Sequence, residues 1–276
     1  MHAVTLLLTL PLLVQEPDSP PATPDVLKKV AVVGASVSAG FGLEREAERS
    51  LDLAQVLGAV TRVETTPARS EASNFLFLDP KGSGTEMVDK IVAEEPTLLV
   101  ATDFLFWFGY GSMNTEKGRL ARFEAGLALL DRFPCPIVVG DLPNMSPSLE
   151  SEAPMLGASQ IPDEAVLAKL NARLAAWAAE RSRVHVMPLA NFVYRVFEGE
   201  RVELRGNVWE DDIDALMQID LLHPTLEGTL GMTLLAMDTL VRGHEDVTAE
   251  MFRWDISAVR EELLPKEDAA PTGGGR

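Results

Sequence analysis

Short apolar runs recur along this chain between stretches with helical spacing, and this alternation is what most restricts its fold. Four such runs, each four to six residues long, cover residues 30–33, 97–101, 136–140 and 184–189. Residues 30–33 are apolar at every position, which is typical of a strand covered on both faces of a parallel sheet. Residues 61–66 alternate more weakly, and we expect them to form one further strand.

Segments with helical character fill the intervals between these runs. They cover residues 49–57, 86–94, 118–132, 163–181 and 225–241. We also expect a helix to open at or just after Ser36, and residues 82–85 to form a turn. Strands that alternate with helices require crossovers that place helices on both faces of the sheet. The sequence therefore predicts an α/β fold, a three-layer α/β/α sandwich with a central parallel sheet of about five strands.

The chain is expected to form a single domain over residues 29–264. Residues 1–15 contain an apolar stretch that is too short for a membrane span and suits a signal peptide, although no Lys or Arg precedes it. Residues 16–28 have the proline content of a linker, and residues 265–276 the composition of a disordered tail. We therefore expect an exported protein, periplasmic or extracellular, with no stable membrane span in its mature form. A cytoplasmic chain with an apolar leader is the alternative.

Charge and cysteine content restrict the partners. The formal net charge is −18 at pH 7 and no basic stripe is present, which argues against a nucleic-acid partner. Cys135 is the only cysteine, so an internal disulfide is excluded, and with no histidine nearby a buried thiol is favoured over a nucleophile. No spacing of His, Cys and carboxylates suggests a metal site. We expect a small-molecule substrate and no metal or cofactor; the oligomeric state stays open.

The first apolar run ends in Gly34-Ala35-Ser36, and this junction is the first candidate for chemistry. A serine delivered at a tight glycine turn after a buried strand is a common way to expose a nucleophile. The same hydroxyl would also serve as the N-cap of a following helix, which is the structural alternative. The glycine spacing fits neither a dinucleotide fingerprint nor a P-loop.

A second candidate lies far downstream, in Asp220-Leu221-Leu222-His223. A helix-capping aspartate and a surface histidine would explain these residues structurally. Together with Ser36 they indicate a catalytic role, because serine is a poor nucleophile until a neutral imidazole accepts its proton. The imidazole in turn needs an acid that fixes its tautomer and stabilises its charged form.

With these two segments the sequence resembles the SGNH, or GDSL-type, hydrolase family over roughly residues 29–241. That family carries its serine in a Gly-Asp-Ser block after the first strand and its acid and base in a C-terminal Asp-x-x-His block. The resemblance implies a flavodoxin-like architecture and cleavage of ester bonds through an acyl-enzyme, with carbohydrate esters within the breadth of the family. It implies Ser36 as nucleophile, His223 as base and Asp220 as the residue that orients it.

The resemblance also implies an oxyanion hole built from the serine N–H, a glycine of a second block and an asparagine of a third. Gly84 is the candidate for the second block. The third block departs from the family, because Asp103 stands where the asparagine is expected, and an ionised carboxylate would repel an oxyanion. Asp103 could instead be protonated or hold another group in place, and Asn144 or Asn114 could supply the missing donor. A binding protein with weakened catalysis is therefore the alternative function.

Two further segments bear on substrate recognition. Residues 104–111 are unusually aromatic, and they could pack as core beneath the sheet or line a substrate pocket. Residues 198–214 connect the last predicted strand to the Asp-x-x-His segment. We expect this connection to form a cap over the site.

Overall fold

The computed structural model describes residues 21–113 and 115–264 and contains the predicted parallel sheet. Its strands are β1 (Lys29–Gly34), β2 (Thr66–Ala72), β3 (Leu98–Ala101), β4 (Ile137–Gly140) and β5 (Val184–Met187). They pair in the order β2-β1-β3-β4-β5, and every pairing is parallel. The predicted signal peptide and the C-terminal tail lie outside the described residues.

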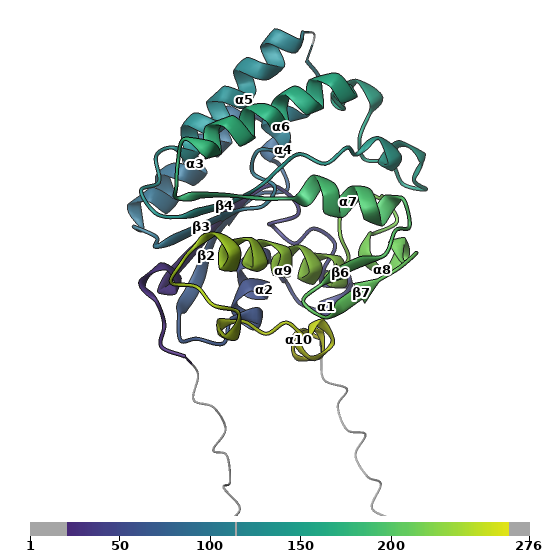
Figure 1. The fold of residues 1–276 in the computed structure, drawn as a ribbon. Coiled ribbons are helices and arrows are strands. Elements are labelled where there is room, and N and C mark those ends of the chain that lie inside the picture. Colours follow the sequence, from purple (N-terminus) through teal and green to yellow (C-terminus); the bar gives the residue numbers. More distant parts are fainter. Residues whose placement is uncertain (1–20, 114, 265–276) are drawn as a thin grey trace, which may run out of the picture.

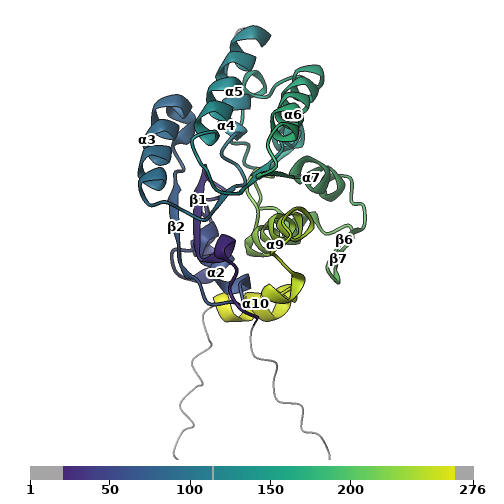
Figure 2. The same ribbon diagram turned by 60° about the vertical axis from the view of Figure 1, so that its left-hand side comes forward.

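Helices cover both faces of this sheet (Figures 1 and 2). One face carries α3 (Pro80–Ala93), α5 (Glu116–Leu130) and α6 (Glu164–Ala179), and the other carries α2 (Leu53–Val60) and α9 (Leu226–Gly243). Against α2 and α9 packs α10 (Ile256–Leu263). The three-layer α/β/α fold class is therefore confirmed. No helix within the described residues is both long enough and apolar enough to cross a membrane.

Shorter elements complete the domain. They are α1 (Glu44–Ala47), α4 (Phe106–Gly109), α7 (Leu189–Phe197), α8 (Ile213–Leu216) and an antiparallel hairpin of β6 (Val202–Leu204) and β7 (Asn207–Trp209). The core strands follow the apolar runs closely, because β1, β3 and β4 lie inside the sheet and are covered on both faces. Val32, Leu99 and Val139 are completely buried there. Burial on both faces explains why these strands were readable as continuous apolar runs.

The prediction for the second strand is wrong. The strand is β2 (Thr66–Ala72), not residues 61–66, and most of its residues are exposed or half-exposed. It lies at the edge of the sheet, paired only with β1. An edge strand needs no continuous apolar run and tolerates Pro67, so its sequence carries little strand signal.

Two predicted helix starts also differ from the structure. Residues 82–85 are not a turn but lie inside α3, which begins at Pro80 after the side chain of Asp79 caps its first turn. After Ser36 only a single helical turn forms, from Ala35 to Ala39. It ends because Gly40 takes φ of +73°, a left-handed conformation that suits glycine.

The domain begins slightly earlier than predicted. Asp25–Leu27 forms a turn of 3-10 helix in which Val26 and Leu27 are buried in the core. The Thr23 hydroxyl donates to the carbonyl of Glu64. Residues 25–28 therefore belong to the folded domain, although they were assigned to the linker.

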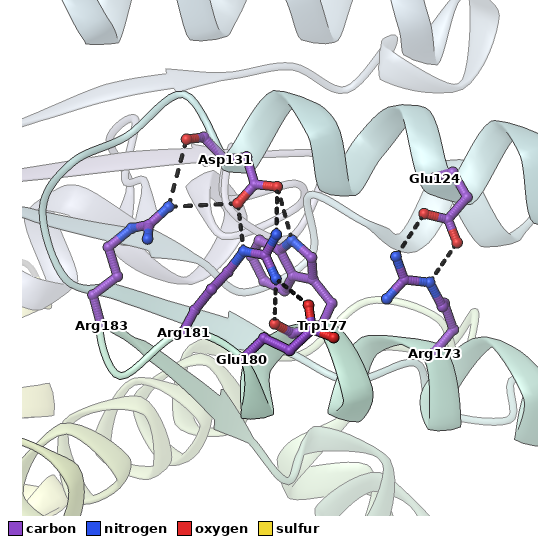
Figure 3. Close-up of polar contacts among 7 residues, drawn as sticks. All are labelled: Glu124, Asp131, Arg173, Trp177, Glu180, Arg181 and Arg183. Atoms are coloured by element: carbon purple, nitrogen blue, oxygen red, sulfur yellow. Dashed lines mark hydrogen bonds and ion pairs between the residues drawn. The ribbon is translucent and has the colours of Figure 1, made fainter.

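A cluster of charged side chains joins α5 to α6 and to the start of β5 (Figure 3). Asp131 accepts hydrogen bonds from Nε of Arg181 at 2.6 Å, from Nε1 of Trp177 at 3.1 Å and from Nη2 of Arg183 at 3.4 Å. Burial opposes ionisation of Asp131, but the hydrogen bonds from Arg181 and Trp177 outweigh it and hold its pKa below the usual range. This cluster lies at the amino ends of β4 and β5, whereas Ser36 follows the carboxyl end of β1.

Candidate active site

The strand order places a crevice where the chain changes direction across the sheet. β1 lies between β2 and β3, so the connections that leave β1 and β3 run to opposite faces of the sheet. Ligands of open α/β sheets bind beyond the carboxyl ends of the strands at such a switch point. Ser36 follows β1 there, and Thr102 and Asp103 follow β3.

Three predicted residues meet at this point in a continuous relay. Oγ of Ser36 lies 2.9 Å from Nε2 of His223, and Nδ1 of His223 lies 2.7 Å from Oδ2 of Asp220. Only 3% of His223 and 5% of Asp220 is exposed. The structure thus brings together residues that are 187 positions apart in the chain.

The environment of Asp220 favours its ionised form. Burial acts to raise the pKa of Asp220, but hydrogen bonds from His223 and from the backbone N–H groups of Leu222 and His223 outweigh it and hold this pKa below the usual range. An ionised Asp220 accepts the Nδ1 proton of His223, which leaves Nε2 free to accept the proton of the Ser36 hydroxyl. The arrangement can therefore deprotonate a serine that attacks an electrophile.

The loop that carries His223 is held by local contacts. Oδ1 of Asp220 accepts from the backbone N–H groups of Leu222 and His223, both at 2.9 Å. Leu221 takes φ of +51° in this turn, a left-handed conformation that costs a leucine of order 1 kcal/mol. The ring of Phe41 lies 4.2 Å from the imidazole, and Nε2 of Gln218 donates to the carbonyls of Phe41 and Pro224, both at 2.7 Å. These contacts tie the histidine loop to the serine loop.

Asp103 has a different position from the one predicted. Its carboxylate accepts from the backbone N–H groups of Ala35, Val37 and Ser38 at 3.0, 2.9 and 3.3 Å, and from the Ser38 hydroxyl at 2.5 Å. Burial raises the pKa of Asp103, and these four hydrogen bonds act against that rise. Asp103 is thus no oxyanion donor; it fixes the turn that presents Ser36, as one of the sequence alternatives allowed.

Close contacts with Ser38 and Asp103 explain why a glycine stands at position 34. A Cβ at Gly34 would lie 2.2 Å from Oγ of Ser38 and 2.3 Å from Oδ1 of Asp103. Any larger residue would displace the hydrogen bond between these two side chains. Glycine at position 34 is therefore required by the contact between Ser38 and Asp103.

The other predicted oxyanion candidates are not at the site. Gly84 lies inside α3, where a Cβ would meet the rings of Phe108 and Phe104, and its N–H belongs to the helix. Its assignment as an oxyanion donor was wrong because residues 82–85 form no turn. Asn144 is exposed, its Oδ1 accepts from the N–H of Ser146, and it does not line the crevice. Asn114 lies outside the described residues.

The crevice itself is an apolar cleft of about 640 Å³, part of it open to solvent. Its polar lining consists of four residues, Ser36, Thr102, Asp103 and Asp141. Its apolar lining includes Trp107, Leu142, Leu189, Val193, Met217 and Met232.

Part of the aromatic segment, residues 104–111, packs in the core and part of it lines the cleft. Phe104, Phe108 and Tyr110 are completely buried, whereas Phe106 and Trp107 line the cleft. The predicted cap is not found. None of the described residues 198–214 lines the cleft, because the hairpin β6–β7 packs against α7 and α9 instead.

Several residues of the site were not identified from the sequence. Thr102 is 4% exposed and lines the cleft, and within the described residues its hydroxyl forms no hydrogen bond. Helix α7 was also missed, although Leu189, Phe192 and Val193 are spaced at the interval of a buried helix face. Gln218 carried no recognisable signal, because its two carbonyl partners depend on the fold.

The comparisons with known proteins concern architecture. No protein-family model and no curated protein matches the chain. A lipase/acylhydrolase from Enterococcus faecalis is similar in structure, with 15% identity, a TM-score of 0.49, and coverage of 87% of this chain and 100% of that one. The crystal structure of TesA has 17% identity, a TM-score of 0.47, and coverage of 77% and 98%.

A G-D-S-L family protein from Desulfitobacterium hafniense DCB-2 has 14% identity, a TM-score of 0.47, and coverage of 77% of this chain and 99% of its own. The parallel five-stranded sheet between helical layers confirms the predicted three-layer architecture. Identities and TM-scores this low assign no activity to the chain.

Proposed function

We propose that this protein is a serine hydrolase that cleaves ester bonds through an acyl-enzyme. The observation that carries the proposal is the relay in which Ser36 lies 2.9 Å from His223 and His223 lies 2.7 Å from Asp220. Ser36 also lines an apolar cleft at the switch point of the sheet.

In this mechanism the oxygen of Ser36 attacks the ester carbonyl while Nε2 of His223 accepts the hydroxyl proton. Asp220 stabilises the resulting imidazolium through Nδ1. His223 then donates the proton to the departing alcohol, which leaves the acyl group on Ser36. A water molecule that loses its proton to His223 attacks this acyl-serine, and the acid departs as the serine recovers its proton.

The tetrahedral intermediate needs donors for its oxyanion, and two groups are suited to this task. The backbone N–H of Ser36 donates to no hydrogen bond among residues 21–113 and 115–264. Thr102 lines the same cleft, and its hydroxyl donates to no hydrogen bond in that part of the chain. We assign the oxyanion contacts to these two groups, in place of the asparagine that the family resemblance implies.

The alternative, a binding protein with weakened catalysis, depended on Asp103 facing the oxyanion. Both carboxylate oxygens of Asp103 instead accept hydrogen bonds from the turn at Ser36, so the serine hydrolase is the function favoured here. The carbohydrate-ester substrate remains a proposal that rests on family breadth.

The proposal is tested with p-nitrophenyl esters and a small organophosphonate. The wild-type protein is expected to hydrolyse the esters and to be labelled at Ser36, and Ser36→Ala is expected to lose both activities. Ser146→Ala, which removes an exposed hydroxyl outside the cleft, serves as the matched control. Full turnover by Ser36→Ala, or labelling at another residue, would refute the proposal.

We also propose that the protein is exported by its N-terminal apolar segment, residues 3–14. Expression of the full chain in a bacterial host, followed by mass determination of the N-terminus in each cell fraction, tests this. A cleaved N-terminus outside the cytoplasm supports export, and an intact chain confined to the cytoplasm contradicts it.

A further inference from the structure

The loop that carries His223 is closed by contacts of its own. Met217 and Pro224 pair as an antiparallel bridge at its base, and the backbone N–H of Gln218 donates to the carbonyl of His223 at 2.8 Å. Inside the loop, Oδ2 of Asp220 lies 2.7 Å from Nδ1 of His223. The geometry of the Asp220–His223 pair is therefore set by contacts within the loop.

The bond from the imidazole to the nucleophile, in contrast, depends on how two distant segments sit against each other. They are the serine loop, residues 35–42, and the histidine loop, residues 216–224. Besides the relay bond itself, one hydrogen bond joins these two loops in the described chain. In that bond, Nε2 of Gln218 donates to the carbonyl of Phe41 at 2.7 Å. The Gln218 side chain is therefore placed to set the distance between the loops.

This hydrogen bond closes a ring of four hydrogen bonds that contains the relay bond. The N–H of Phe41 donates to the carbonyl of Ser36 at 3.0 Å, and the carbonyl of Phe41 accepts from the side chain of Gln218. The backbone N–H of Gln218 donates to the carbonyl of His223, whose Nε2 lies 2.9 Å from Oγ of Ser36. Because the ring is closed, a displacement of His223 from Ser36 also distorts the other bonds of the ring.

The amide group of Gln218 is held on both sides. Its Nε2 faces the carbonyl oxygens of Phe41 and Pro224, both at 2.7 Å, so each of its two N–H groups has an acceptor. Its Oε1 lies against Gly42, where a Cβ would approach it to 2.2 Å. Gly42 also takes φ of +80°, a conformation that favours glycine. A side chain without two donors at this point leaves at least one of the two carbonyls unpaired.

The histidine loop needs support from outside because its turn is strained. Leu221 takes φ of +51°, and a leucine keeps this conformation only where surrounding contacts hold it. On the side of the serine loop, the ring of Phe41 packs on the imidazole of His223 with 4.2 Å between the ring centroids. The hydrogen bond from Gln218 to the Phe41 carbonyl adds a directional contact to this packing.

We infer that Gln218 is a positioning residue of the hydrolase. Its side-chain amide holds the histidine loop at the distance from which Nε2 of His223 accepts the proton of Ser36. This inference rests on the proposed function and adds a residue to it. Gln218 does not line the cleft, so it acts on proton transfer and not on substrate binding. A misplacement of a catalytic group by about 1 Å lowers a rate by about 100-fold.

Gln218→Met tests this role, because it removes both donors and keeps an unbranched side chain of similar length. We expect kcat on p-nitrophenyl acetate to fall about 100-fold, and KM to change by less than about threefold. His223 acts in both acylation and deacylation, so both steps slow while the cleft is unchanged. Labelling of Ser36 by the organophosphonate should slow by a similar factor. Gln55→Met, an exposed change on α2 outside the cleft, is the matched control and should keep the wild-type kcat.

A proton NMR measurement separates misplacement of the loop from loss of its fold. The proton on Nδ1 of His223, in its hydrogen bond to Asp220, gives a resonance at low field. Contacts within the loop set this pair, so the resonance should persist in Gln218→Met while kcat is low. Loss of the resonance together with kcat would show that Gln218 maintains the fold of the loop, and would overturn the positioning role.

The remaining outcomes separate this inference from the proposed function. Wild-type kcat in Gln218→Met, with Ser36 labelled at the wild-type rate, would refute the role of Gln218 and leave the proposed function intact. Absence of both hydrolysis and Ser36 labelling in the wild-type protein would refute the proposed function itself.

Discussion

Asp103 accepts a hydrogen bond of 2.5 Å from the hydroxyl of Ser38, and the same carboxylate accepts three backbone N–H groups of the turn around Ser36. Four donors converge on one buried acceptor, so the carboxylate determines the shape of the turn. Its removal leaves buried N–H groups unpaired, and each such group costs about 1–3 kcal/mol.

Replacement of Asp103 by asparagine separates its structural role from a role at the oxyanion. Asp103→Asn directs an amide NH₂ at groups that are themselves donors, so we expect the turn to shift and kcat on p-nitrophenyl esters to fall about 100-fold. Had Asp103 faced the oxyanion, the new amide would raise kcat. Asp89→Asn, an exposed change on α3, should leave kcat unchanged. Steady-state kinetics together with thermal unfolding distinguish the two outcomes.

Thr102→Val tests the assigned oxyanion contact. The change removes the hydroxyl and keeps the branched shape, so we expect kcat to fall about 10²–10³-fold with little change in KM. Thr102→Ser restores a hydroxyl and is expected to recover most of this loss. Wild-type kcat in Thr102→Val would show that another group stabilises the oxyanion.

The sequence was sufficient to predict the central sheet, because β1, β3 and β4 are buried on both faces and read as apolar runs. It failed at β2, where an edge position allows polar residues and Pro67. It failed again at residues 82–85, where the glycines suggested a turn but Asp79 and Pro80 begin a helix. A local sequence pattern predicts a strand or a helix correctly only where tertiary contacts do not override it.

The site was predictable only in part, for a related reason. Two short sequence blocks carry Ser36, Asp220 and His223. Their order along the chain, and not either block alone, indicated a catalytic role. The role of Asp103 depends on hydrogen bonds between the segments that follow β1 and β3, which no local pattern reveals. The cleft is assembled from residues scattered between Ala35 and Met232, so its apolar character became visible only in three dimensions.

Cys135 is expected to be inert in the folded protein. Its side chain is buried, and burial raises the pKa of its thiol to about 11, so the reactive thiolate is almost absent at pH 8. A thiol-specific disulfide reagent should therefore react with the protein only after unfolding in guanidinium chloride. Cys135→Ala should retain esterase activity. Rapid labelling of the native protein at pH 8, or loss of turnover in the alanine variant, would contradict this prediction.

The cluster around Asp131 predicts how stability depends on pH. The pKa of Asp131 is lower in the folded protein than in the unfolded chain. Its contribution is therefore fully present above the unfolded pKa of about 4 and is lost as the pH falls through the lower folded pKa. Because the side chain of Asp131 is 36% exposed, solvent screening limits this contribution. We expect Asp131→Asn to reduce the free energy of unfolding at pH 7 by roughly 1 kcal/mol, the size expected of a partly exposed network.

At this chain length such a change lowers Tm by about 2–4 °C. The difference in Tm between the wild type and Asp131→Asn should shrink below about pH 4, where the wild-type carboxylate also becomes protonated. Glu86→Gln is the control, because Glu86 is exposed on α3 and forms no ion pair within residues 21–113 and 115–264. Calorimetry from pH 3 to pH 8 measures both variants, and a Tm difference that grows toward acid pH would contradict the assigned sign.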